Sequence, residues 1–549
     1  MTKSRWKRGT LVALSLALAL SGCVGKERKN EPEVAVKDSN VTAPGELPIV
    51  KDKITLRLGT YASNNIIDYK TNEYTKFLEE KTGIDFEFDV IVNPEQKIKI
   101  MLAANDKLPD LLFGMNFSQE MLIKYGKNGT GALVDLGDYM DNYGYYLDEC
   151  LSKTVVPNLE KRLTTEDGGR YFMPGIGEQT GNMYCLKAFI NKKWLDKLGL
   201  EVPKTTEEFK NVMHRFVNED PNGNGKKDEI GITGCTNGWN AIPWHFFVNS
   251  FIYDDIWDEI IVDDNNKASS ILYTKEFKEA LKYINELYKD GAYDENAFTQ
   301  DSAALRMQCQ NDVNTIGCIV ASDIDSYFAN APEKILDYVA LPPLVGPEGV
   351  AYAVKSDVNV VTNGIMTKYC QNRLAAFRLM DYMLSEEASI FSRFGVEGKD
   401  WKPATENDRS VFESINAKPR IVSILPYGSV QNSNWEERNP FFRSLSLSDG
   451  MAWNGSPYDG EKFKGDALAV YYGKEFKNRM PATSYTVEEQ EEKAFLQTDL
   501  KQHIDQEMAK FILGRRSLDE YDKFLKELDS LGFARYLKIV QSGIDRASE

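Results

Sequence analysis

The stretch from Asp220 to Glu229 carries the residues whose types and spacing could most readily do chemistry. Its oxygen-bearing side chains recur at short intervals and belong to Asp220, Asn222, Asn224, Asp228 and Glu229. Gly223 and Gly225 allow the tight backbone turn that would bring these oxygens together. Calcium takes about six to eight oxygen ligands, and the first half of the stretch matches the EF-hand pattern D-x-[DN]-x-[DN]-G. We therefore predict a structural calcium site here.

The second half of this loop departs from the EF-hand pattern. The last position of the pattern is Gly231, where an EF-hand has a bidentate glutamate. We expect Glu229 to make the bidentate contact two residues early and the main-chain oxygen of Lys226 to serve as the mid-loop ligand. The alternative is a polar turn without metal, because Asp-Pro and Asn-Gly are also ordinary turn signals.

Length and composition limit the class of protein. A chain of 549 residues exceeds the size of a single core, which predicts two or more domains or one large two-lobed protein. The apolar share of 42% and the charged share of 27% are typical of a soluble globular chain. The net charge of -17 argues against binding to nucleic acid or to anionic lipid by charge.

The N-terminus has the pattern of an export signal. Four basic residues precede the apolar run Leu11–Leu20, which is too short to span a bilayer. The following Leu20-Ser21-Gly22-Cys23 resembles the bacterial lipobox, so we expect residues 1–22 to be a signal peptide and Cys23 to be acylated, for example with palmitate. An ordinary signal peptide with a chance cysteine is the alternative. Residues 23–51 have few apolar side chains, which predicts a lipidated N-terminus and a disordered tether.

The remaining cysteines show no metal-binding spacing. They are Cys150, Cys185, Cys235, Cys309, Cys318 and Cys370. An even number outside the cell would permit disulfides, but no pairing can be chosen from sequence. We favour isolated buried thiols.

Alternating apolar residues predict an α/β fold in the first half of the chain. Strands are expected at Ile54–Leu58, at Phe86–Val90 and at Leu108–Phe113, with helices between them. This order implies a parallel sheet with right-handed crossovers. Ligands in such sheets lie beyond the carboxyl ends of the strands, here in the loops after Leu58 and Phe113.

Further segments indicate a second lobe. The chain is expected to cross to it within residues 170–188 and to return through strands at 339–343 and 358–365. Thr205 and Glu208 form a capping box for a helix that leads directly into the calcium loop. Apolar stripes predict a helical C-terminal region. The expected boundaries are 52–175 plus 364–411 for the first lobe and 176–363 plus 412–549 for the second.

Several separated stretches together resemble one family. They are Leu20–Cys23, Tyr74–Gly83, Leu108–Asp110, Lys193–Leu200 with Pro203–Thr205, the calcium loop, Gly395–Trp401 and Phe511–Leu531. In order and spacing the chain resembles the extracellular solute-binding proteins of bacterial ABC importers, in particular the large lipoproteins that include LipO-like and alginate-oligosaccharide-binding proteins. The resemblance covers nearly all of the mature chain and weakens between Pro403 and Pro457.

The resemblance implies a periplasmic-binding-protein-like (class II) fold, in which two α/β lobes enclose a cleft. It also implies a monomer anchored by lipid to the outer face of the cytoplasmic membrane, which captures an oligosaccharide and delivers it to an ABC permease. The family's calcium site maps onto the six positions named above. Aromatic rings suit pyranose faces and amides suit hydroxyls. The candidate ligand residues are Trp239, Trp244, Tyr427, Trp435 and Trp453, with Asn182 and Asn454 as hydroxyl partners.

Two other functions fit the same sequence. A secreted glycoside hydrolase would need two carboxylates flanking the scissile bond, and acidic residues are abundant here. However, the chain has no G-x-S-x-G or H-E-x-x-H motif and only three histidines, so we expect no enzymatic activity. The other alternative is a lipoprotein that presents its ligand to a membrane sensor rather than to an importer.

Overall fold

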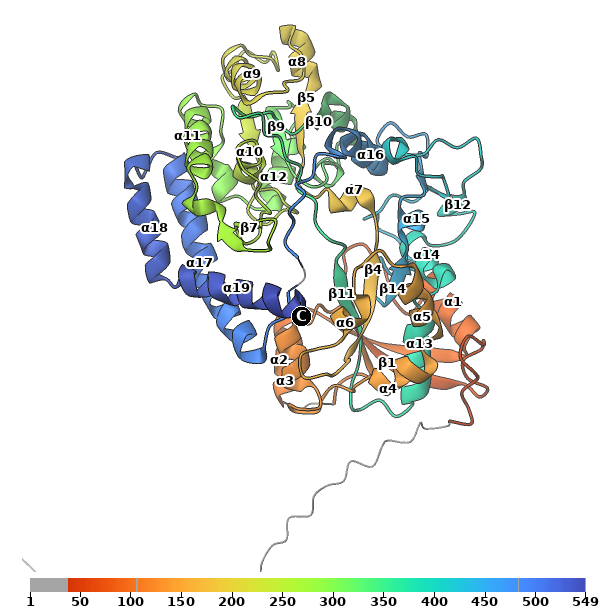
Figure 1. Cartoon of the computed structure of the whole chain (residues 1–549). Coiled ribbons are helices and arrows are strands. Elements are labelled where there is room, and N and C mark those ends of the chain that lie inside the picture. The colour runs from red at the N-terminus through yellow and green to blue at the C-terminus, as the bar shows by residue number, and fades with distance from the viewer. Residues whose placement is uncertain (1–37, 105–106, 482, 549) are drawn as a thin grey trace, which may run out of the picture. The chain divides into compact units, whose positions relative to one another are not determined.

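The computed structural model describes residues 38–104, 107–481 and 483–548, so the predicted signal peptide, Cys23 and residues 24–37 lie outside the described residues. Asp38–Glu549 form one compact unit. Within this unit, two large hydrophobic cores form around two separate sheets. We call the part of the unit built around the core with Leu58 and Leu112 the first lobe. The part built around the core with Ile190 and Phe277 is the second lobe (Figure 1).

The first lobe is built on a six-stranded sheet. In pairing order its strands are β14 (Phe441–Arg443), β4 (Phe172–Gly177), β11 (Val360–Met366), β3 (Leu111–Phe113), β1 (Ile54–Tyr61) and β2 (Ile84–Ile91). Strand β1 pairs in parallel with both β2 and β3, which confirms the predicted β-α-β-α-β order. Strand β11 runs antiparallel to β3 and β4.

Helices flank the first sheet. Their bounds are α1 (Glu73–Thr82), α2 (Pro94–Ala104), α3 (Gln119–Tyr125), α4 (Gly137–Tyr143), α5 (Tyr145–Lys153), α6 (Leu159–Leu163), α13 (Arg373–Tyr382) and α14 (Glu386–Phe394). Helix α1 ends at Gly83, which adopts φ of 75° and so takes the left-handed cap that a residue without Cβ favours. Helix α14 packs beside β14, and α13 packs beside β11.

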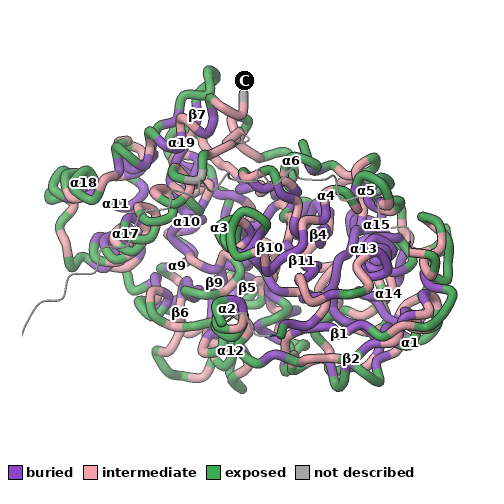
Figure 2. The backbone as a smooth tube through the Cα atoms, turned by 90° about the horizontal axis from the view of Figure 1, so that it is seen from below, coloured by how far each residue is buried: buried purple, intermediate pink, exposed green. Residues whose placement is uncertain are grey.

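The second lobe has a four-stranded sheet. Its strands in pairing order are β10 (Tyr338–Leu341), β5 (Ala188–Asn191), β9 (Ile316–Val320) and β6 (Ile230–Thr233). Strands β6 and β9 are parallel, while β5 is antiparallel to β9 and β10. Every residue of β9 is buried, and Figure 2 shows this strand within the interior of the lobe.

The helices of the second lobe include the predicted C-terminal region. Their bounds are α8 (Lys192–Leu198), α9 (Thr206–Asn218), α10 (Pro243–Val248), α11 (Lys275–Lys289), α12 (Ser302–Cys309), α16 (Gly460–Tyr471), α17 (Val487–Ile512), α18 (Tyr521–Ser530) and α19 (Phe533–Ser548). Helix α17 packs against α11 and α19, and α18 presents a largely exposed outer side (Figure 2).

Smaller elements complete the described residues. They are the pair β7 (Ile260–Val262) and β8 (Ala268–Ser270), the sheet of β12 (Trp401–Pro403), β13 (Ile421–Ser423) and β15 (Met451–Ala452), helices α7 (Thr180–Met183) and α15 (Leu445–Ser448), and 3₁₀ turns at Ile271–Tyr273, Glu295–Phe298, Asp325–Tyr327, Pro332–Asp337, Glu413–Ile415 and Leu518–Glu520.

The chain passes between the lobes at several points. It leaves the first sheet after β4, runs through α7 and enters the second sheet at β5. It returns between β10 and β11. Strand β14 lies beside β4 in the first sheet, and Phe442 belongs to the first core. The segment around β14 therefore belongs to the first lobe, which corrects the predicted boundary that put all of 412–549 in the second.

Residues 38–51 are folded, which corrects the predicted tether at its C-terminal end. Val41 pairs with Val50, and the amide of Val50 donates to the carbonyl of Thr82 at 3.2 Å. The side chains of Ile49 and Val50 are buried in the first core. The low apolar content of the whole stretch concealed a few apolar residues at its end, and their burial against α1 offsets the entropy of ordering this segment.

Two further findings concern the chain as a whole. The six cysteines of the described part are free thiols and all are buried, as predicted. Across residues 38–104, 107–481 and 483–548, no helix combines the length and the apolar character needed to cross a bilayer.

Candidate functional site

The predicted calcium loop joins α9 to β6. The capping box is present, because the Thr205 hydroxyl accepts from the Glu208 amide at 3.1 Å and the Glu208 carboxylate accepts from the Thr205 amide at 3.3 Å. The helix buries the predicted stripe that includes Phe209 and Phe216. It therefore delivers the chain to Asp220 in a fixed direction, two residues after its last turn.

The Asp220 carboxylate organises the loop backbone. One oxygen accepts from the amides of Gly223 at 2.9 Å and Asn224 at 3.1 Å, and the other accepts from the amide of Gly225 at 3.1 Å. Gly223 and Gly225 adopt φ of 77° and 74°, in the left-handed region where a side chain would cause strain. The two glycines thus serve the turn that the sequence predicted.

The other oxygen-bearing side chains of the loop contact one another. Asp228 accepts from the amide groups of Asn222 and Asn224, both at 2.9 Å, and these bonds lower its pKa. Glu229 differs, because its Oε1 is buried and has no hydrogen-bond partner among the described residues. Burial, followed by the charges of Asp220 and Asp228, raises the pKa of Glu229.

This arrangement leaves a buried carboxylate oxygen beside two other acidic side chains, which is the environment that a bound cation would relieve. Three histidine, cysteine or carboxylate side chains do not converge into a metal-binding group anywhere in the described ranges. In the loop, amide donors occupy the oxygens of Asp228. A calcium ion would therefore have to displace these amides.

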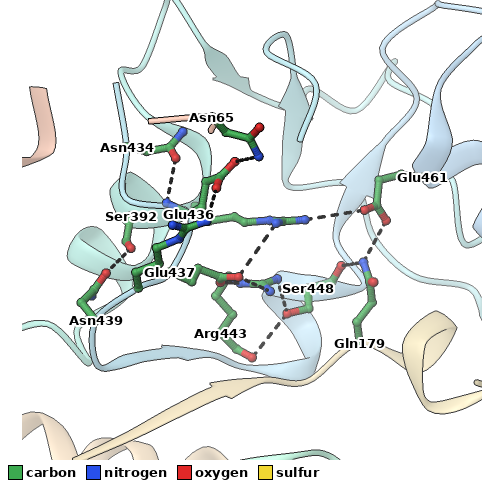
Figure 3. A network of polar contacts seen from close by, with 12 residues as sticks. Asn65, Gln179, Ser392, Asn434, Glu436, Glu437, Asn439, Arg443, Ser448 and Glu461 are labelled. Carbon is green, nitrogen blue, oxygen red and sulfur yellow. Dashed lines mark hydrogen bonds and ion pairs between the residues drawn. The ribbon is translucent and has the colours of Figure 1, made fainter. Parts of the chain in front are cut away.

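A second candidate site is a buried polar network that joins the lobes (Figure 3). On the first lobe it contains Arg393 at the end of α14, Glu437 before β14 and Arg443 within β14. Glu437 lies 3.9 Å from the Arg393 guanidinium and forms an ion pair with Arg443 through both oxygens. Arg443 also donates to the Ser448 hydroxyl at 3.0 Å.

Helix α16 of the second lobe supplies the other side of this network. Glu461, in its first turn, lies 4.0 Å from the Arg393 guanidinium. Gln179, between β4 and α7, donates to Glu461 at 3.0 Å. Lys464, one helical turn further, lies 3.2 Å from Glu461 and 3.9 Å from Asp323, which follows β9. Arg393 and Glu461 therefore connect the two lobes directly.

Electrostatics keeps this network ionised. Only 14% of the Arg393 side chain is exposed, and burial alone would lower its pKa, but the charges of Glu437 and Glu461 raise it. Burial would raise the pKa of Glu461, but Lys464 and Arg393 lower it. These groups can hold charge in the interior because each has an opposite charge beside it.

Asp325 and Lys187 lie close to the network on the second lobe. Burial and the neighbouring Asp323 raise the pKa of Asp325 to about 6. The fully buried Lys187 donates to the carbonyls of Gly181 and Ser322, both at 3.0 Å. Because Gly181 lies in α7 and Ser322 follows β9, Lys187 ties the crossing segment to the loop that carries Asp323.

Two predicted aromatic residues lie beside the network with exposed rings. Tyr427 is 65% exposed, and its ring centre lies 3.6 Å from the Arg393 guanidinium. Trp239 is 49% exposed, and its carbonyl accepts from the amide of Ser322 at 2.9 Å, next to Asp323. The ring of Tyr427 therefore lies on Arg393, and the backbone of Trp239 lies beside the loop that carries Asp323.

Two other predicted aromatic residues lie in the cores. Trp244 is 1% exposed and packs edge-on to Phe277 in the second core. Trp435 is also 1% exposed, and its indole nitrogen donates to the Thr75 hydroxyl at 3.0 Å in the first core. Neither ring has a face left for a ligand, so we correct the prediction by removing both from the candidate set.

The remaining predicted residues lie near α7 and α16. Asn182, in α7, has a buried side-chain oxygen without a partner among the described residues. Trp453 is half-buried against the second core, and its indole donates to the Ser456 carbonyl at 2.8 Å. Asn454 is exposed, and its side chain accepts from the amide of Ser456 at 2.8 Å. Asn182 therefore keeps a free acceptor, whereas the other two serve a local turn.

Sequence reasoning missed several members of this site, including Arg393, Glu461, Lys464 and Tyr61. Tyr61 ends β1, and its ring centre lies 4.3 Å from the Arg438 guanidinium. A signal for Tyr61 was present, since ligands were expected in the loop after Leu58. Arg393, Glu461 and Lys464 carry no local sequence signal, because their partners come from distant parts of the chain.

The placement of Trp435 leads to a prediction. Trp435→Phe keeps an aromatic ring but loses the hydrogen bond to Thr75 and leaves part of the volume of the buried indole empty, so we expect a loss of about 2 kcal/mol or more in unfolding free energy. Oligosaccharide affinity at temperatures below the transition should stay unchanged. Urea unfolding and calorimetric titration on the same preparation would measure both, and an affinity loss without a stability loss would return Trp435 to the ligand site.

The comparisons with known proteins agree with this fold. The chain is 25% identical to the fructooligosaccharide ABC transporter substrate-binding protein FusA of Streptococcus pneumoniae serotype 4, over 98% of each chain. It is 21% identical to the polygalacturonan/rhamnogalacturonan-binding protein YtcQ of Bacillus subtilis, over 99% of each. A solved structure of an EF-hand mutant of S. pneumoniae FusA with fructo-nystose is 22% identical, covers 90% of this chain and 99% of its own, and has a TM-score of 0.71.

The fold and the family model identify the same group of proteins. Two α/β lobes joined by crossing segments are the architecture that the sequence predicted, and the structural neighbours share it. The model of the bacterial extracellular solute-binding proteins matches residues 63–390, which is more than half of the chain. This chain belongs to the family of bacterial extracellular solute-binding proteins.

Proposed function

We propose that this protein is the extracytoplasmic substrate-binding component of an ABC importer and that it captures an oligosaccharide between its two lobes. The observation that carries this proposal is the polar network in which Arg393 of the first lobe meets Glu461 of the second, with the exposed ring of Tyr427 on Arg393. The exposed Trp239, whose carbonyl bonds Ser322 beside Asp323, is the candidate ring on the second lobe. Residues from both lobes at one site let a ligand favour the closed state, because only the closed state offers all of its contacts.

The chemistry of this network suits a sugar. The exposed face of an aromatic ring packs against the C–H face of a pyranose or furanose, and the guanidinium behind Tyr427 holds that ring in place. Hydroxyl groups need donors and acceptors at short range. Near α7, Asn182 has an unpartnered oxygen, and Gln179 and Lys464 bond each other and Glu461 in contacts that a sugar would have to share or replace.

The energy of closure is within reach of such a ligand. Shifting a population from mostly open to mostly closed takes about 5.5 kcal/mol of differential binding. A micromolar ligand provides about 8.2 kcal/mol in total. A few rings and hydroxyl pairs contributed by the second lobe can therefore drive closure, and the closed form is the one that a permease would recognise.

The relatives support this reading of the cargo, and the description of the family supports an extracellular location. FusA is a fructooligosaccharide-binding component and YtcQ a polygalacturonan- or rhamnogalacturonan-binding protein. We propose that this chain likewise works with permease subunits, as a monomer held at the outer face of the cytoplasmic membrane by lipid on Cys23. It would release its cargo unaltered rather than act as an enzyme.

We also propose that the loop at 220–229 holds a structural calcium ion. Asp220, Asn222, Asn224, Asp228 and Glu229 would bind it through side-chain oxygens and Lys226 through its carbonyl. The buried and unpaired oxygen of Glu229 supports this assignment, as does the EF-hand of a FusA mutant structure. Such an ion would fix the start of β6 to the end of α9, and it supplies charge neutralisation rather than catalysis.

A binding and cleavage assay tests the cargo. The mature protein would be titrated by calorimetry with kestose, nystose, galactotriose, xylotriose and maltotriose, followed by a reducing-end assay of each mixture. We expect at least one of these sugars to bind at micromolar concentration and to remain intact. New reducing ends would favour a glycoside hydrolase. A sugar-loaded protein to which no ABC permease responds would favour a sensor lipoprotein.

A further inference from the structure

The arginines and Lys464 of the interlobe network each have a carboxylate partner already, and the neighbouring Lys187 is fully buried and donates to two backbone carbonyls. Arg393 lies beside both Glu437 and Glu461. Arg443 pairs with Glu437, and Lys464 pairs with Glu461. No cation of this network is therefore available to a ligand without losing a protein partner.

Arg438, at the edge of the network, shows the same pattern. Its guanidinium lies 3.0 Å from Glu436 and covers the face of Tyr61 at 4.3 Å. Glu436 in turn accepts from the side chain of Asn65 at 3.0 Å. The aromatic faces at Tyr61 and Tyr427 are thus each backed by a guanidinium whose charge a carboxylate balances.

Carboxylates, by contrast, exceed the cations around the network. Asp323 and Asp325 follow β9. The ammonium of Lys464 lies 3.9 Å from Asp323 and also pairs with Glu461, and the buried ammonium of Lys187 lies near Asp323 as well. Asp325 lies against the start of α16, because a Cβ on Gly460 would come within 2.1 Å of its oxygen. Asp449, between α15 and β15, bonds Thr180 through the amide at 2.8 Å and through the hydroxyl at 2.6 Å. These groups make the site negative as a whole.

From this charge arrangement we infer that the interlobe site selects neutral oligosaccharides and rejects those that carry uronic acids. A sugar hydroxyl can donate to Asp323, to Glu461 or to the unpartnered oxygen of Asn182 without adding charge to the site. A uronate group can only accept, and it would bring a negative charge among carboxylates. It would have to break an existing ion pair to gain a cation, and the released carboxylate would remain buried without a partner.

This inference deepens the proposed function and rests on it. It separates two kinds of cargo that the relatives represent, since fructooligosaccharides are neutral whereas polygalacturonan is acidic. The selectivity comes from repulsion between the site's carboxylates and a uronate as well as from favourable contacts with the neutral sugar. Specificity against a ligand of nearly the same shape is usually obtained in this way.

The experiment compares matched sugar pairs on the mature wild-type protein. Galactotriose and trigalacturonate, and mannotriose and trimannuronate, differ chiefly in a hydroxymethyl against a carboxylate. Kestose and nystose extend the neutral set. In each matched pair whose neutral sugar binds, we expect the affinity for the neutral sugar to be about 30-fold or more higher than the affinity for the uronate at low salt. Raising sodium chloride should strengthen uronate binding, because salt screens repulsion, and should leave the neutral sugar unaffected.

A variant pair tests the origin of the selectivity. Glu461→Gln frees Lys464 and Arg393 from one carboxylate, so the ratio of neutral to uronate affinity should fall about 10-fold. Asp466→Asn removes the same charge from an exposed position of α16, where Asp466 pairs with Lys462, and should leave the ratio unchanged. Circular dichroism would confirm that both variants fold. If either variant does not fold, the comparison of matched sugars on the wild-type protein still tests the inference.

The outcomes separate this inference from the proposed function. Uronates that bind as tightly as their neutral partners, or that bind more weakly as salt rises, would overturn the charge selectivity while the oligosaccharide function stands. A wild-type protein that binds none of the sugars would overturn the proposed function and the inference with it. Weak uronate binding that recovers in Glu461→Gln but not in Asp466→Asn would support both.

Discussion

The double variant Tyr427→Ala/Trp239→Ala should bind oligosaccharide about 100-fold more weakly than the wild type. Both rings are exposed, Tyr427 on the guanidinium of Arg393 and Trp239 beside the loop that carries Asp323. In the proposed site, each substitution would remove one aromatic face from the sugar. An aromatic contact of this kind contributes about 1.5 kcal/mol, which is about a tenfold effect for each ring. Calorimetric titration with the best sugar from the panel would measure the change.

The chain offers matched controls for this prediction. Trp257 is 45% exposed and Tyr145 is 52% exposed, so both resemble the two candidate rings in exposure. They lie away from the network, in the turn before β7 and at the start of α5. Trp257→Ala/Tyr145→Ala should bind the sugar as the wild type does. Equal losses in both double variants would show that Tyr427 and Trp239 are not ligand contacts.

Calcium should raise the melting temperature of the wild-type protein, and a chelator should reverse the effect. At a free concentration about 100-fold above the dissociation constant, mass action stabilises the folded state by about 2.7 kcal/mol. This corresponds to about 5 °C if the second lobe unfolds as a unit. The physical reason is that the ion would satisfy the buried oxygen of Glu229 and offset the repulsion among the loop carboxylates. Differential scanning calorimetry with calcium and with EGTA would measure the shift.

The calcium response of variants gives the sharper result. Asp228→Ala also loses hydrogen bonds from Asn222 and Asn224, so its melting temperature alone decides nothing. The difference between calcium and EGTA should vanish in Asp228→Ala and persist in a variant of the exposed Asp312, Asp312→Ala. A wild-type protein with the same melting curve in calcium and EGTA would rule out the metal site.

Local patterns predicted much of the fold. The alternation of Ile54, Leu56 and Leu58 specified β1, because a strand buried on one face repeats every second residue. The Thr205–Glu208 capping box specified the start of α9, because both partners lie within one turn. The glycine positions of the 220–229 loop were also predictable, since the left-handed conformation has its own residue preference.

Long-range pairings could not be predicted in the same way. Strand β14 has three residues and no periodicity, and it becomes a strand because β4 offers it an edge. Trp435 and Tyr427 look alike as aromatic residues in an irregular stretch. Trp435 is buried because Tyr74 and Phe88, which are far from it in sequence, pack around its ring, and Thr75 accepts its indole hydrogen. Arg393 and Glu461 likewise acquire their role only when two distant helices meet.

The burial of all six described thiols has a practical consequence for measuring lobe motion. Burial raises the pKa of Cys309 and of Cys370 to about 12, so these thiols stay protonated and unreactive toward maleimides at neutral pH. In a chain shortened to begin after Cys23, a cysteine introduced at an exposed position of each lobe would therefore carry a fluorophore or a spin label without background. Distance distributions between the two labels would then report the open and closed populations directly as sugar is added.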